Sequence, residues 1–134
     1  MTELDQVIAE AFARQGEQSS VNQVHLLFLK STLFLPVDKE PVPTDEEPFR
    51  PLFAEFEQRI FMLVFDTLDR FTDWAGEQVG QLAYVEITGR DIIAGVGEDV
   101  YLVLNAGTEY CKEFSPDEIK YLKKIVTRID EMKE

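Results

Sequence analysis

The feature that most constrains the fold is the apolar run IFMLVF at residues 60–65. Arg59 and Asp66 bound this run, and an unbroken apolar segment of this length is typical of a central strand that is buried on both faces. The run is far shorter than the roughly 20 residues of a membrane-spanning helix. It therefore predicts the interior of a β-sheet, with other strands beside it and helices over it.

Further strands are predicted by short apolar or β-branched segments. They cover residues 33–37, 83–87 and 101–104, with a shorter strand at 110–114 and an extended piece at 50–53. Pro36 places the first of these at a sheet edge or ends it early, because proline lacks the N–H that a central strand donates.

Helices are predicted where apolar residues recur at three- and four-residue spacing. They cover residues 2–15, 19–31, 67–76, 89–94 and the segment from 115 onwards. The expected capping residues are Thr2, Ser19 or Ser20, Thr67, Thr88 and Ser115. In the first helix Asp5 completes a capping box, and in the last Glu118 does the same behind Pro116. The apolar faces are expected to include Phe12 in the first helix and Leu68 in the third.

The order of these elements contains two strand–helix–strand units, but some strands are also direct neighbours in the chain. This indicates an α+β fold: a mixed β-sheet flanked by helices, with a helical N-terminus and a long C-terminal helix. The chain has 134 residues, and domains most often hold roughly 100–150. We therefore expect 1–134 to form a single domain with an acidic, proline-rich loop at 38–48.

The charge is strongly negative and unevenly placed. Twenty-six Asp and Glu face thirteen Lys and Arg, which gives a formal net charge of -13. Residues 112–134 sum to zero, so the whole excess lies in the first 111 residues. Such a charge repels phosphate backbones and anionic lipid, which predicts no nucleic-acid and no membrane partner. The acidic body suits a basic protein partner, or it serves solubility alone.

The single cysteine and the first residues of the sequence indicate the cellular compartment. Cys111 is the only cysteine, and the start MTELDQVIAEAF has acids where a signal peptide has basic residues. A single cysteine without an export signal is typical of a reducing cytoplasm, so we expect a cytoplasmic protein.

Patterns for catalysis or metal binding are sparse. His25 is the only histidine and stands inside an apolar helix, where a partly exposed packing role is expected. Nothing beyond their presence supports a nucleophile–base pair of Cys111 and His25. Residues 95–97 lack the Lys of a phosphate loop, and the acidic loop lacks calcium-ligand spacing. The sequence therefore predicts no catalytic residue, no cofactor and no metal.

The best candidate for a binding site is the segment NAGTEYCKE at residues 105–113. Asn105 and Gly107 favour a tight turn, and the charges after them lie beside the N-terminus of the last helix. The candidate residues, for a peptide or a small anion, are Asn105, Gly107, Thr108, Glu109, Tyr110, Lys112 and Glu113. The alternative is a turn that only joins two strands and caps the helix.

This same segment carries a family resemblance. Residues 102–122 read LVLNAGTEYCKEFSPDEIKYL, which resembles the motif LVLNPGSxxGKEFxPEEIxxL of the SseB protein N-terminal domain family, named after the enhanced serine sensitivity protein. The resemblance spans roughly Leu4 to Val126 and departs from the motif at Ala106 and Cys111. It implies the fold and a bacterial cytoplasmic protein, and it supplies no catalytic residue, because the family name comes from a growth phenotype.

Two classes of function stay open on these grounds. The first is a non-enzymatic protein-interaction or regulatory module that acts through the NAGT turn or through the segment 38–56; homodimerisation is a further possibility. Four aromatic residues in and after that segment form either core or a contact patch: Phe49, Phe53, Phe56 and Phe61. The second class is a small-molecule-binding or enzymatic domain that uses the strand-end carboxylates Asp66, Glu86 and Glu109.

Overall fold

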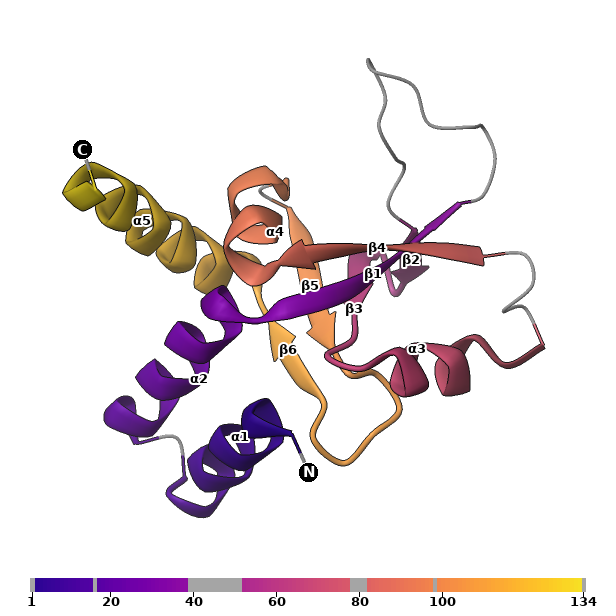
Figure 1. The fold of residues 1–134 in the computed structure, drawn as a ribbon, viewed down its shortest axis with the longest axis horizontal. Coiled ribbons are helices and arrows are strands. Elements are labelled where there is room, and N and C mark those ends of the chain that lie inside the picture. The colour runs from indigo at the N-terminus through magenta and orange to yellow at the C-terminus, as the bar shows by residue number, and fades with distance from the viewer. Residues whose placement is uncertain (1, 16, 39–51, 78–81, 98, 134) are drawn as a thin grey trace.

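The computed structural model describes residues 2–15, 17–38, 52–77, 82–97 and 99–133 (Figure 1). Within these ranges the elements are α1 (Glu3–Ala13), α2 (Gln18–Lys30), β1 (Thr32–Asp38), β2 (Phe53–Phe56), β3 (Arg59–Val64), α3 (Leu68–Ala75), β4 (Leu82–Thr88), α4 (Gly89–Gly95), β5 (Val100–Leu104), β6 (Lys112–Phe114) and α5 (Pro116–Lys133). This order confirms the predicted α+β fold with its helical N-terminus and long C-terminal helix. Most of the predicted acidic loop, with Phe49, lies outside the described residues.

The described strands form two sheets that meet at one point. A four-stranded mixed sheet has the order β2-β3-β5-β6, in which β3 and β5 are parallel and the outer pairs are antiparallel. β1 and β4 form an antiparallel pair. Phe34 and Phe65 exchange backbone hydrogen bonds of 2.8 and 3.0 Å and so join the two sheets. Because β3 and β5 are parallel, their carboxyl ends lie at the same edge of the sheet.

The main core lies on one face of the four-stranded sheet. Met62 and Leu102 pair across β3 and β5 on this face, and residues of α2, α4 and α5 pack against it together with β1 and β4. Phe28 and Phe114, both fully buried, stack with ring centroids 4.7 Å apart. On the opposite face, α3 covers a smaller cluster around Leu63 (Figure 1).

Most predicted caps are confirmed. The Thr2 hydroxyl accepts from the backbone N–H of Asp5 at 3.1 Å, and the Asp5 carboxylate accepts from the N–H of Thr2 at 3.0 Å. The hydroxyls of Thr67 and Thr88 cap α3 and α4 by accepting from the N–H groups of Arg70 and Asp91, each at 3.2 Å. The prediction for α2 is wrong: this helix begins at Gln18 after Glu17 and has no side-chain cap. Ser19 and Ser20 lie within its first turn because the N–H of Ser20 already bonds the carbonyl of Glu17.

The predicted burial of β3 is wrong in part. β3 does lie between two strands, but only its second half is buried, and the Ile60 side chain is 45% exposed. The core packs over Met62 and Val64 and ends before Ile60. Phe12 and Leu68 are also exposed, against expectation, because each apolar stripe is wider than the strip of helix that the core covers.

Helices α2 and α4 approach each other closely at Gly89. A Cβ atom at Gly89 would lie 2.0 Å from the backbone oxygen of Phe28, and the N–H of Gly89 donates to the Ser31 carbonyl at 3.0 Å. A backbone contact this short leaves no room for a side chain.

We therefore expect Gly89→Ala to lower the free energy of unfolding by roughly 2 kcal/mol or more, since the two helices must move apart. Gly95→Ala, at the other end of α4, is the matched control, because a Cβ there meets nothing within 4 Å. Alanine is the better helix former by about 1 kcal/mol, so Gly95→Ala should leave stability unchanged or slightly raised. Urea denaturation of both variants tests this; equal stability of the two would contradict the described contact.

Candidate functional site

The predicted NAGT turn follows β5 and is closed by its own side chains. Asn105 and Gly107 both have positive φ, 59° and 85°, which confirms the tight-turn geometry expected of these residue types. Thr108 donates its hydroxyl hydrogen to the carbonyl of Asn105 at 2.9 Å and accepts from the N–H of Tyr110 at 3.2 Å. The turn is therefore a defined structure that holds its own shape.

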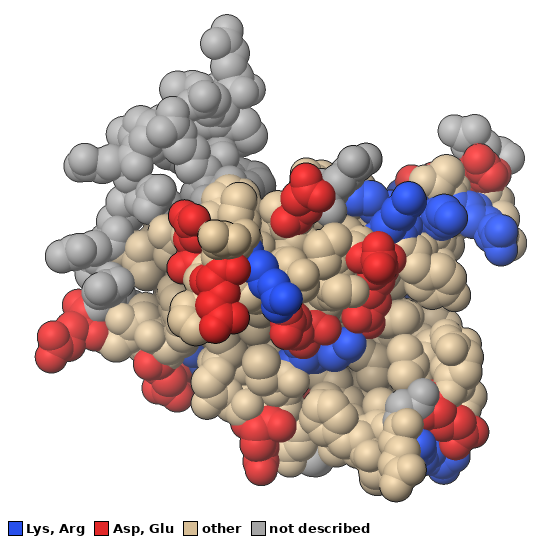
Figure 2. All heavy atoms as spheres, turned by 180° about the vertical axis from the view of Figure 1, so that it is seen from behind, with Lys and Arg blue, Asp and Glu red and all other residues tan. Residues whose placement is uncertain are grey.

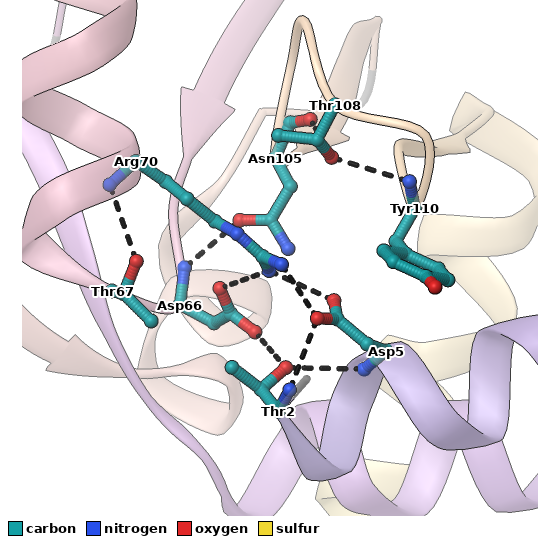
Figure 3. Close-up of polar contacts among 8 residues, drawn as sticks. All are labelled: Thr2, Asp5, Asp66, Thr67, Arg70, Asn105, Thr108 and Tyr110. Atoms are coloured by element: carbon teal, nitrogen blue, oxygen red, sulfur yellow. Dashed lines mark hydrogen bonds and ion pairs between the residues drawn. The ribbon is translucent and has the colours of Figure 1, made fainter.

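A buried ionic cluster lies directly below this turn (Figure 3). Arg70 of α3 donates to both carboxylate oxygens of Asp5, at 2.8 and 2.5 Å, and to Asp66 at 2.8 Å. Thr2 donates to Asp66 at 2.5 Å, and the N–H of Asp66 donates to the side-chain oxygen of Asn105 at 3.0 Å. We call these five residues the Arg70 cluster. They tie the start of α1, the end of β3, α3 and the turn together.

The charged groups of the Arg70 cluster stabilise one another in their ionised forms. Asp5 is fully buried, which by itself would raise its pKa, but the hydrogen bonds and charge of Arg70 and the bonds from Thr2 hold that pKa below its usual value. The bonds to Asp5 and Asp66 raise the pKa of Arg70. Because both carboxylates share one guanidinium, Arg70 is not free to receive an external anion.

A second cluster lies at the start of α5 and involves the lone histidine. His25 Nε2 and Glu118 Oε2 are 2.8 Å apart, and Lys112 Nζ lies 3.0 Å from the same oxygen. Lys112 also donates to the carbonyl of Glu113 at 3.0 Å. His25 is only 4% exposed, so the expected partly exposed role is wrong. The Glu118 side chain bonds His25 and Lys112, which draws its carboxylate away from the predicted capping-box role, while Ser115 does cap the helix at 3.2 Å.

Burial would raise the pKa of Glu118, but the hydrogen bonds from His25 and Lys112 lower it overall. The carboxylate therefore stays charged and bridges α2 to β6. Like Arg70, the Glu118 carboxylate is fully paired with side chains of the domain itself.

The candidate residues of the turn thus divide into two groups. Asn105, Thr108 and Lys112 hold the segment in place, and Asn105 is fully buried. The outward-facing residues are Gly107, Glu109 and Glu113, with Tyr110 half-buried between the turn and α1 (Figure 3). Partial burial and the neighbouring charge of Glu109 raise the pKa of Tyr110.

The strand-end carboxylates do not share one environment. Asp66 belongs to the Arg70 cluster and its side chain is 5% exposed, whereas Glu86 and Glu109 are exposed. Among the described residues, no group of three or more His, Cys, Asp or Glu side chains is arranged to hold a metal ion. Cys111 is half-buried, and this burial raises the pKa of its thiol.

The β2–β3 hairpin carries the most exposed aromatic side chains of the sheet. Phe53 is 50% exposed and lies on the same face as the exposed Ile60, whereas Phe56, which is 66% exposed, pairs with Arg59 and lies on the opposite face. A hollow of about 320 Å³ opens at this end of the sheet and is lined by Phe53, Ala54, Glu55, Ile60 and Val100. We call these five residues the hairpin surface. The sequence singled out Phe53 and Phe56, but it placed Ile60 in the core. Phe61 stacks on Tyr101 at 5.3 Å, on the other face.

Acidic side chains predominate on the surface. Figure 2 shows them spread over the centre of one face with some basic side chains between them, and a row of basic side chains where α5 lies. This matches the uneven charge of the sequence, with its excess of acids in the first 111 residues.

The fold and these sites define a small acidic α+β domain. Two internal charge clusters, the Arg70 cluster and the cluster around Glu118, hold its elements together. The model of the SseB protein N-terminal domain family matches residues 4–121, so the chain belongs to this family. Comparison with curated proteins and with solved structures gives no match. None of the helices in the described ranges is long and apolar enough to cross a membrane.

The Arg70 cluster predicts a specific pH dependence of stability. Replacing Asp5 by Asn leaves the buried Arg70 with one carboxylate partner in place of two, so Asp5→Asn should lower the free energy of unfolding at pH 7 by about 3 kcal/mol. The folded pKa of Asp5 is depressed, so its contribution is present above the unfolded value of about 3.9 and is lost as pH falls through the folded pKa.

Chemical denaturation at pH 7 and in steps below pH 4 measures both effects. Glu3→Gln is the control, because Glu3 is an exposed acid in the same first turn of α1. The control should lose at most about 1 kcal/mol. If Asp5→Asn behaves like Glu3→Gln, the Arg70 cluster does not stabilise the fold.

The second cluster gives an independent prediction. Glu118→Gln should lower the free energy of unfolding by roughly 1–3 kcal/mol, because His25 and Lys112 lose a charged, half-buried acceptor. Asp117→Asn, at the exposed neighbouring position, should change it by only a few tenths. Thermal denaturation followed by circular dichroism compares the two; a larger effect at Asp117 would be inconsistent with the described bridge.

Proposed function

We propose that this domain is a non-enzymatic protein-interaction module, and that its contact surface is the hairpin surface. The observation that carries the proposal is the exposure of Phe53 and Ile60 on one face of the hairpin, where they line a hollow of about 320 Å³. Soluble proteins rarely expose adjoining large apolar side chains except where they bind something. Aromatic side chains that line a hollow are also the usual anchors of protein interfaces.

The sheet edge supports the same surface. β2 ends the order of the four-stranded sheet, and all four of its residues are exposed. Edge strands present unpaired backbone groups that a partner can contact, which natural proteins otherwise cover.

The internal charge clusters support this proposal indirectly. Arg70 and Lys112 are paired within the domain, so the predicted turn offers few free groups for a ligand. The alternative, a small-molecule or enzymatic site on Asp66, Glu86 and Glu109, has weaker support, because these carboxylates lie in different environments. We propose that such a module acts in the bacterial cytoplasm, because the single cysteine of the sequence suits a reducing compartment.

Capture from a bacterial lysate by the immobilised domain tests the proposal. Phe53→Ser should reduce the amount of captured protein by about tenfold, the loss expected of an interface anchor. Phe12→Ser is the matched control, because Phe12 is 58% exposed on α1 and does not line the hollow of the hairpin surface. Circular dichroism verifies that both variants are folded.

Tyr110→Ala distinguishes the two surfaces that the sequence allowed. We expect capture by this variant to equal that of the wild type. If Tyr110→Ala removes capture while Phe53→Ser does not, the turn is the contact surface and the proposal is wrong. It is equally wrong if the wild-type domain captures nothing.

A further inference from the structure

A second hollow lies on the same face of the sheet as the hairpin surface, and we call the two hollows together the trough. Phe53 and Met62 are register partners in β2 and β3, as are Ile60 and Val100 in β3 and β5. Met62 also lines a second hollow, of about 100 Å³, together with Leu35, Ile87, Ile92, Gly95, Val96 and Asp91. The two hollows therefore lie on the same face of the sheet, the first at the end that the core leaves open and the second beside Met62, which the core covers.

The rim of this trough is acidic. Glu55 lines the first hollow and Asp91 the second, and both side chains are exposed. Glu57, in the hairpin turn, is exposed as well. No Lys or Arg is among the described residues that line either hollow. The nearest basic residue of the hairpin, Arg59, lies over the Tyr101 ring at 5.2 Å.

The shape and charge of the trough limit what fits it. Elsewhere on this face, helices α4 and α5 cover the sheet with apolar side chains at helical spacing. A further helix over Phe53, Ile60 and Val100 would extend the same cover, and its apolar stripe would fill the hollow that these residues line. Basic residues beside that stripe would meet Glu55 and Asp91, so charge complementarity selects a basic helix.

We propose that the trough binds a basic amphipathic helix of another protein. This rests on the proposed function of the hairpin surface and names the partner by its chemistry. A second copy of this chain is a poor occupant, because two molecules with a net charge of -13 repel each other.

Fluorescence polarisation with synthetic helices tests the proposal. The probe is a labelled peptide of Leu and Lys, about 18 residues or five turns long, with Leu on one face. Two further peptides serve as controls: one replaces every Lys by Glu, and one scrambles the Leu/Lys order. At physiological salt the Lys peptide should bind at least about tenfold more tightly than either control.

Matched variants separate the trough from general charge attraction. Phe53→Ser and the double variant Glu55→Lys, Asp91→Lys should each weaken binding of the Lys peptide by about tenfold. The double variant Glu3→Lys, Asp69→Lys changes the net charge equally at exposed positions on α1 and α3, and it should weaken binding less than about threefold. If both double variants weaken it equally, the peptide follows net charge alone and the proposal is wrong.

The remaining outcomes are equally decisive. If the Lys and Glu peptides bind equally and Phe53→Ser removes both, the hairpin surface is a contact surface but its partner is not basic. If sedimentation shows a dimer of the domain that Phe53→Ser dissociates, the occupant is a second copy and the proposal is wrong. If no peptide binds while Phe53→Ser still removes capture from lysate, only the helix proposal fails. If capture also persists in Phe53→Ser, the proposed function fails with it.

Discussion

The structure depends most on the pairing of Arg70 with two buried carboxylates. Asp5 arrives from the first helix and Asp66 from the end of β3, and their charges are tolerable inside the domain only because one guanidinium is shared between them. The N–H of Asp66 bonds the Asn105 side chain, and the N–H of Asn105 bonds the Val64 carbonyl at 2.8 Å. The carboxyl ends of the two parallel strands are thereby fixed to each other and to α1.

The two ends of the sheet consequently differ. At the carboxyl ends of β3 and β5, charged side chains are paired and the turn is closed by its own hydrogen bonds. At the opposite end, the core stops before Ile60 and leaves apolar side chains at the surface. A partner binds side chains that are not already paired or packed within the domain. The hairpin end of the sheet has such side chains, in Phe53 and Ile60, whereas the turn end has few. This difference is the physical basis for placing the contact surface at the hairpin.

Local features were predictable from the sequence, and long-range contacts were not. Thr2, Thr67, Thr88 and Ser115 cap their helices because a hydroxyl three residues before an N–H is within reach in any such helix. The left-handed turn at Asn105 and Gly107 follows from residue type alone. Hydropathy could not show that half of β3 is exposed, because burial depends on which helices cover a strand.

The candidate site shows the same division. The sequence marked residues 105–113 as special, and Asn105 and Lys112 do hold key contacts, but their partners could not be read from the chain. Asp5 and Arg70 are 65 positions apart, and His25 and Glu118 are 93 apart. No spacing rule connects such pairs, so the sequence left both a binding role and a structural role open for this segment. The sequence marked Phe53 and Phe56 as members of a possible contact patch, but it did not show that their strand pairs with β3.

Chemical-shift mapping of the ¹⁵N-labelled domain with the Lys-bearing amphipathic peptide tests the central claim most directly. The account predicts that the backbone amides of β2, of the first half of β3 and of Val100 shift on addition of the peptide. The chemical shifts of the amides of residues 105–110 should not change, because the polar groups of the Arg70 cluster below them are already hydrogen-bonded to one another. Shifts confined to residues 105–110, with an unperturbed hairpin, would contradict the account.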